Sequence, residues 1–143
     1  MSTERRQARE QALSLLYEAE TKSQSPAALV AEQVLEPDAF TVDVVAGVEA
    51  SGPEIDALIT RFAENWPLAR MPALDRTLLR MGVYELTHRP DFPTGVVLSE
   101  IVDLASIYST DDSGPFVNGV LAAIAAEVRG GVDGDPETQP AAG

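Results

Sequence analysis

The sequence contains no cysteine, one histidine and one lysine. Without cysteine the chain has no disulfide, no thiolate metal site and no catalytic thiol. The single histidine, His88, leaves too few ligands for a typical zinc site. It falls at the end of a predicted helix, where an imidazole interacts favourably with the helix dipole. These absences predict a protein without a typical zinc site.

Long hydrophobic runs are also missing. No stretch approaches the ~18 to 20 continuous apolar residues that span a membrane. The N-terminal segment MSTERRQARE is charged, and the apolar core of a signal peptide does not follow it. We therefore expect a soluble, cytoplasmic protein without a membrane segment.

Recognisable catalytic spacings are absent as well. The carboxylate pairs Asp111–Asp112 and Asp133/Asp135 fall in a predicted loop and in the C-terminal segment. No glycine-rich phosphate loop follows a strand, and no serine has a base positioned beside it. The sequence thus predicts a binding protein, not an enzyme, with no catalytic residues.

The charge is strongly negative, at −13 over 143 residues. Bulk charge of this sign argues against nucleic acid, which is bound through Lys and Arg on phosphates. The arginines nevertheless form two groups, one of Arg5, Arg6 and Arg9 and a looser one of Arg76, Arg80 and Arg89. Arginine forks match phosphate geometry. Each group is either a phosphate-binding surface or an ordinary solvated helix face.

Helical periodicity dominates the chain, and no segment alternates as a strand does. Hydrophobic residues make up 45% of the chain and aromatic residues only 6%, which predicts an aliphatic core. We predict an all-α domain over 1–129, followed by a disordered tail over 130–143 that is acidic and rich in Gly and Pro. Helices are expected at roughly 3–21, 26–35, 40–48, 54–66, 72–88, 96–108 and 114–128.

Two of these helices carry specific expectations. In the sixth, the helical spacing places Tyr108 on one face with Val97, Ile101 and Leu104. In the seventh, Asp111, Asp112 and Ser113 suit a helix N-terminus and Pro115 suits the first turn. Gly119 predicts a close helix crossing at its position. Asn118 either ties that crossing by hydrogen bonds or reaches a ligand.

Three segments resemble the NusB family of bacterial transcription antitermination factors: RRQAREQALSLLYEAE, LDRTLLRMGVYEL and STDDSGPFVNGVL, in this order. The resemblance implies seven helices in two bundles, with no reaction and no cofactor. It implies a partner, NusE, which is also a protein of the small ribosomal subunit. It also implies binding to boxA, a short single-stranded element of ribosomal-operon or phage leader RNA, in company with other Nus factors and RNA polymerase.

The resemblance also implies roles for individual residues. The residues expected to face RNA are Arg5, Arg6, Arg9, Arg76, Arg80, Tyr17, Phe116 and Asn118. The residues expected to face NusE are Asp75 and Asp112. Tyr17 and Phe116 have an alternative interpretation as core residues, because aromatic side chains are commonly buried.

One departure from the family weakens the expected RNA surface. Many members carry lysines where this chain has Thr94–Gly95, Ser106 and Gly114–Pro115. We therefore predict that the chain alone binds RNA weakly and in a salt-sensitive manner, with NusE supplying much of the positive surface. Two alternatives remain: a protein–protein scaffold with little RNA binding of its own, and a homodimer that buries the arginine face.

Overall fold

The computed structural model describes residues 3–130, and within that range it contains seven α-helices, one 3-10 turn and no strand. The elements are α1 (Thr3–Thr21), α2 (Pro26–Glu32), α3 (Ala39–Ala50), α4 (Gly52–Phe62), η1 (Leu68–Arg70), α5 (Ala73–His88), α6 (Thr94–Tyr108) and α7 (Ser113–Val128). The predicted all-α class is confirmed. The predicted tail, beyond Gly130, lies outside the described residues, so the division at residue 129 stays a prediction.

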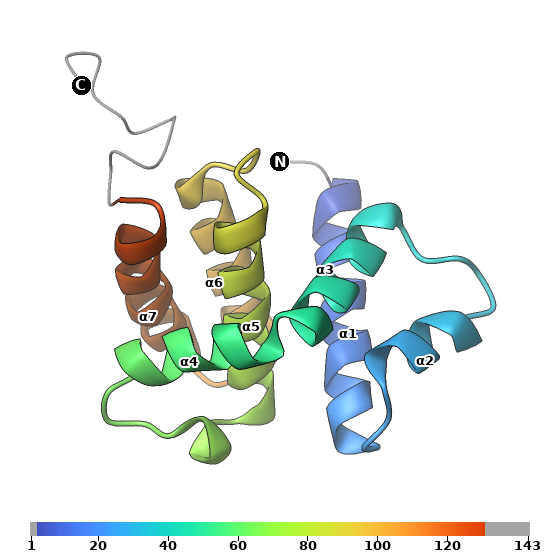
Figure 1. Ribbon diagram of the computed structural model, residues 1–143, viewed down its shortest axis with the longest axis horizontal. Coiled ribbons are helices and arrows are strands. Elements are labelled where there is room, and N and C mark those ends of the chain that lie inside the picture. Colours follow the sequence, from blue (N-terminus) through green and yellow to red (C-terminus); the bar gives the residue numbers. More distant parts are fainter. Residues whose placement is uncertain (1–2, 131–143) are drawn as a thin grey trace.

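The helices form two bundles (Figure 1). In the first, α1, α2 and α3 pack against one another, and in the second α4, α5, α6 and α7 do so. Helix α5 joins the two, because it also packs against α1 and α3. Its buried side chains lie on most of its circumference, as in a helix with neighbours on several sides.

One close approach of helices lies at Gly82 on α5. A Cβ atom there would lie 2.6 Å from a methyl carbon of the buried Leu121 on α7, so a larger residue would force Leu121 to shift. At Gly119 nothing lies within 4 Å of such an atom. The prediction that Gly119 marks a close crossing is therefore wrong: the glycine that the α5–α7 contact requires is on the other helix.

Helix α4 ends earlier than its apolar pattern predicts. It stops at Phe62, whereas the sequence suggests continuation to the residue before Pro67. After the helix ends, the indole of Trp66 packs edge-on against Phe116 of α7, with ring centroids 4.7 Å apart. Trp66 therefore lies outside α4 and packs against α7, although its spacing in the sequence continues the apolar face of α4.

Candidate functional site

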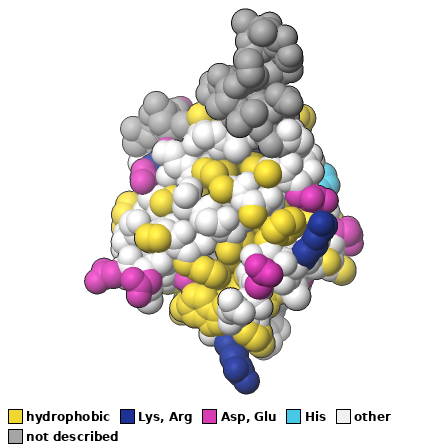
Figure 2. Space-filling view, turned by 90° about the vertical axis from the view of Figure 1, so that its left-hand side faces the viewer, with side chains coloured by type: hydrophobic (Ala, Val, Ile, Leu, Met, Phe, Trp, Pro, Cys, Tyr) yellow, Lys and Arg dark blue, Asp and Glu magenta, His cyan; other side chains and the backbone are white. Residues whose placement is uncertain are grey.

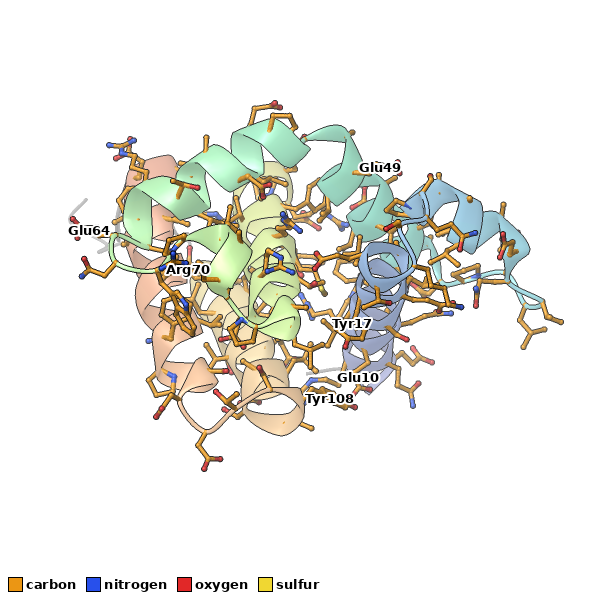
Figure 3. All side chains as sticks on the ribbon, turned by 90° about the horizontal axis from the view of Figure 1, so that it is seen from below. Glu10, Tyr17, Glu49, Glu64, Arg70 and Tyr108 are labelled. Carbon is orange, nitrogen blue, oxygen red and sulfur yellow. The ribbon has the colours of Figure 1, made fainter. Side chains whose placement is uncertain are left out.

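A groove between α1 and α6 carries two exposed tyrosines. Tyr17 is 38% exposed and Tyr108 is 46% exposed. The groove has a volume of about 330 Å³ and is lined by Glu10, Leu13, Ser14, Tyr17, Leu74 and Tyr108. Figure 3 shows Glu10, Tyr17 and Tyr108 close together on one side of α1. Of the two interpretations of Tyr17, core packing does not hold.

Tyr108 differs in burial from the other residues on its helical face. Its hydroxyl donates to Glu10 Oε2 across the groove at 2.8 Å, and this hydrogen bond raises the pKa of the phenol. Val97, Ile101 and Leu104, which the spacing places on the same helical face, are buried, whereas Tyr108 is exposed. Tyr108 is the last residue of α6, beside a polar loop, and that position was the available signal for an exposed ring.

Arg6 lies at one end of the same helix pair and is held by two carboxylates of α6. Its Nε donates to Glu100 Oε1 at 2.7 Å, and its Nη2 donates to Glu100 Oε2 at 3.1 Å and Asp103 Oδ2 at 3.0 Å. These charge-assisted bonds lower the pKa of Glu100 and raise that of Arg6. Glu100 is buried, whereas Asp103 is exposed. Sequence reasoning missed both carboxylates.

Arg9 is completely buried, with 0% of its surface exposed. Its Nε and Nη2 make a fork with both oxygens of Glu85 on α5, at 3.0 and 2.7 Å. Removing one partner from such a pair leaves an uncompensated buried charge. Arg9 therefore ties α1 to α5, and its place in the structure does not fit the RNA-facing role expected for it.

Arg5 and Arg9 do share a helix face, as their spacing predicts. Both guanidinium groups lie over the ring pair of Phe40 and Phe92, at 4.5 Å and 5.0 Å from the Phe40 centroid. Arg89 approaches the same pair, 4.6 Å from the Phe92 centroid. Cation–π contacts of this kind stabilise the junction between the two bundles. Of the first arginine group, Arg5 and Arg6 remain partly exposed.

Arg76 and Arg80 bind carboxylates at the opposite end of α1. Both guanidinium groups contact Glu20, and Arg80 also makes a fork with Asp56 at 2.8 and 3.0 Å. Arg76 further donates to the carbonyl oxygens of Leu68 and Met71, each at 3.0 Å. These bonds hold α1, α4 and η1 on α5. Both arginines therefore have structural partners in place of the free surface expected of them.

Asp75 is 1% exposed, so it offers no surface to a partner protein. Its Oδ1 accepts hydrogen bonds from the hydroxyls of Ser109 and Ser113, the latter at 2.7 Å. The expected NusE-facing position of Asp75 does not fit this burial; the residue fixes the loop between α6 and α7. Asp112 is exposed on that loop at the N-cap of α7, but its side chain makes no capping bond there.

Phe116, Asn118 and Gly119 lie on α7, outside the α1–α6 groove. Phe116 is half-buried, while Asn118 and Gly119 are exposed. Asn118 therefore does not tie a buried crossing. Phe116 and Gly119 line a second groove of about 700 Å³ together with Phe62 and Trp66. The expected RNA-facing residues thus fall into separate places, and only Arg6 and Tyr17 lie along the α1–α6 side.

Neither a metal cluster nor a membrane span occurs in residues 3–130. No group of three His, Asp or Glu side chains in that range is arranged to hold an ion. No helix in the same range is long and apolar enough to cross a membrane.

Comparison with known proteins gives one consistent answer. The profile of the NusB family matches residues 6–126. The transcription antitermination protein NusB of Clavibacter sepedonicus is 47% identical over 131 residues, covering 85% of this chain and 96% of that protein. Its counterpart in Saccharopolyspora erythraea is 46% identical over 127 residues, covering 85% and 86%.

Solved structures agree with the sequence relatives. T. maritima NusB superposes with a TM-score of 0.81 at 31% identity, covering 96% of this chain and 98% of that one. A second match is a crystal structure of antitermination factors NusB and NusE in complex with double-stranded RNA. It has a TM-score of 0.77 at 30% identity and covers 89% of this chain and 99% of that one.

Proposed function

The chain belongs to the NusB family, and we propose that it is an antitermination factor that binds boxA-type leader RNA together with NusE. In this proposal the pair acts in the cytoplasm with other Nus factors and RNA polymerase, and it keeps transcription of ribosomal RNA operons processive. The chain's contribution is recognition; no chemical step is involved.

The observation that carries the RNA part of the proposal is the groove with Tyr17 and Tyr108. Unpaired bases of single-stranded RNA stack on exposed aromatic rings, whereas the bases of duplex RNA are already paired and stacked on one another. The two rings flank one cavity on the same side of α1 as Arg6, whose guanidinium is partly exposed. Stacking platforms next to a cation are the usual combination for single-stranded RNA.

The carboxylates of the same surface explain why the chain should need a partner. Arg6 already donates hydrogen bonds to Asp103 and Glu100, and the Tyr108 hydroxyl already donates one to Glu10. A phosphate must displace Asp103 before it can use the outer edge of Arg6. With a net charge of −13, RNA binding by the chain alone is therefore expected to be weak, and a basic protein such as NusE supplies the missing positive charge.

Asp112 remains the proposed contact for NusE, since it is exposed at the start of α7. Asp75 takes an indirect role: it holds Ser109 and Ser113 at the two ends of the loop that presents Asp112. It is a positioning residue in this proposal.

The test is a titration of labelled boxA-type RNA with the chain alone and with NusE, at 50 and 200 mM salt. Binding that requires NusE and weakens with salt supports the proposal. Tyr17→Ala should weaken binding by the complex, because one stacked base is worth about 1 to 3 kcal/mol. Ser99→Ala, on the exposed face of α6, is a control. Tight binding by the chain alone at 200 mM salt contradicts the shared surface.

The alternative function is a scaffold within the transcription complex that has little RNA affinity. The carboxylates paired with Arg6, Arg76 and Arg80 favour it. It predicts NusE binding without RNA binding in the same titration. Sedimentation of the chain alone checks the third hypothesis, the homodimer.

A further inference from the structure

The buried ion pairs of α1 form a chain that leads from its contact with α5 to the surface. Arg9 and its partner Glu85 are completely buried. Glu100 of α6 is buried as well, whereas Arg6 is partly exposed. Glu100 lies between the two arginines, 2.7 Å from Arg6 Nε and 4.0 Å from Arg9 Nη1. One carboxylate thus faces a guanidinium group that no ligand reaches and another that a ligand does reach.

Glu100 serves these two arginines unequally. Its Oε1 accepts a hydrogen bond from Arg6 Nε, but the 4.0 Å to Arg9 Nη1 exceeds hydrogen-bonding distance. Nη1 of Arg9 is buried and has no hydrogen-bond partner among the described residues. A buried donor without an acceptor costs free energy, so a movement of Glu100 toward Arg9 would be favourable for Arg9.

We propose that Arg9 is a positioning residue for RNA: it accepts the Glu100 carboxylate as a partner when a phosphate binds Arg6. The proposal rests on the proposed function, in which Arg6 meets the RNA backbone. The phosphate compensates the charge of Arg6, and Glu100 Oε1 closes the 4.0 Å gap to Arg9 Nη1. Glu85 keeps Nε and Nη2 of Arg9, so the buried guanidinium stays in place.

Other ion pairs lack this arrangement. Glu20, at the opposite end of α1, also contacts two arginines, but Arg76 and Arg80 both already donate hydrogen bonds to it. Moving Glu20 from one to the other would therefore satisfy no new donor. On the face shown in Figure 2, the Lys and Arg side chains lie apart from one another. The Arg6–Glu100–Arg9 group differs because its buried member has a donor in reserve.

Arg9→Lys tests the proposal through RNA affinity. Lysine keeps a positive charge for Glu85 but has one nitrogen in place of the fork, so Glu100 loses the donor that would receive it. We expect the complex with NusE to bind boxA-type RNA about two- to tenfold more weakly, the range of one net hydrogen bond. Arg61→Lys is the control, because it also replaces an ion-paired arginine by lysine, on α4. Thermal unfolding gives the temperature below which both variants are folded, and the affinities are compared there.

NMR of the unmodified chain separates a positioning role from a merely structural one, and it decides even if Arg9→Lys fails to fold. The guanidinium protons of Arg9 should exchange slowly with water because the side chain is completely buried, and this identifies their signals. When RNA and NusE are added, we expect the signals of Arg9 Nη1 and of the Glu100 carboxylate carbon to shift together with that of Arg6 Nε.

Each outcome separates this proposal from the proposed function. If Arg6 shifts while Arg9 and Glu100 do not, Arg9 is only structural and the proposal is wrong, although the proposed function stands. If RNA binds without a shift at Arg6, or if folded Arg9→Lys binds RNA as tightly as Arg61→Lys does, the proposal is also overturned and the proposed function again stands. If the unmodified chain binds no RNA with NusE, the proposed function itself fails, and the role of Arg9 fails with it.

Discussion

Replacing Asp103 by asparagine removes the exposed carboxylate from the outer edge of Arg6. Asp103 Oδ2 accepts from Arg6 Nη2 at 3.0 Å, and the two side chains are 56% and 26% exposed. Glu100 still holds Arg6 from the buried side, so the guanidinium keeps its place. The change therefore frees one donor edge for a phosphate without releasing the arginine.

The expected effect follows from the strength of exposed ion pairs. Such a pair contributes about 0.5 to 1 kcal/mol, because solvent screens it. An RNA phosphate that no longer has to break the pair gains that amount, which corresponds to about two- to fivefold tighter binding. The gain should shrink as salt rises, since added ions screen both the pair and the phosphate contact.

The assay compares Asp103→Asn with Glu127→Gln, using fluorescence anisotropy of boxA-type RNA in the presence of NusE. Glu127 also belongs to an exposed ion pair, with Arg61 at 3.2 Å, so both variants lose one negative charge and free one arginine. Only Asp103→Asn acts on the α1–α6 side. Equal affinities for the two variants would refute the reasoning, because overall charge alone would then account for any gain.

Three further predictions concern stability, each measured by urea or thermal unfolding. Arg9→Met should destabilise the fold by about 3 to 5 kcal/mol, because it leaves Glu85 charged, buried and unpaired; a loss below 1 kcal/mol would contradict this. Because the hydrogen bond from Arg6 lowers the pKa of Glu100 below its ordinary value of 4.5, the ionised carboxylate stabilises the folded state at a pH above 4.5. This contribution to the free energy of unfolding should be lost as the pH falls through the pKa of Glu100 in the folded state. Glu100→Gln should make the free energy of unfolding less dependent on pH in that range. Gly119→Ala should stabilise by up to about 1 kcal/mol, whereas Gly82→Ala should destabilise; the same sign for both would argue against the packing described.

Much of the fold was predictable because it depends on local pattern. Apolar residues at helical spacing predicted seven helices, and the described residues contain seven α-helices at those places. The expected start of the second helix at residue 26 is also correct: Pro26 lies in the first turn of α2, and Ser25 Oγ accepts from the Ala28 N–H at 3.4 Å. The three motifs were sufficient to indicate the family.

The candidate site was less predictable, because it depends on what faces each side chain. Arg5 and Arg9 lie on one helix face, as the spacing predicts, but that spacing does not reveal that Glu85 of α5 encloses Arg9. Likewise, nothing local shows that Asp103 of α6 meets Arg6. Each of these partners is more than seventy residues away in the chain.

The sequence by itself determined the all-helical class and the family, and it supplied the charged and aromatic residues proposed for the site. Only the tertiary structure decided which of them a ligand can reach. The ring of Tyr108 is exposed, whereas the carboxylate of Asp75 is buried. Of two helical glycines, Gly82 is needed for helix packing and Gly119 is not. The physical reason is that helix periodicity assigns a side chain to a face, whereas accessibility and ion pairing depend on the element that packs against that face.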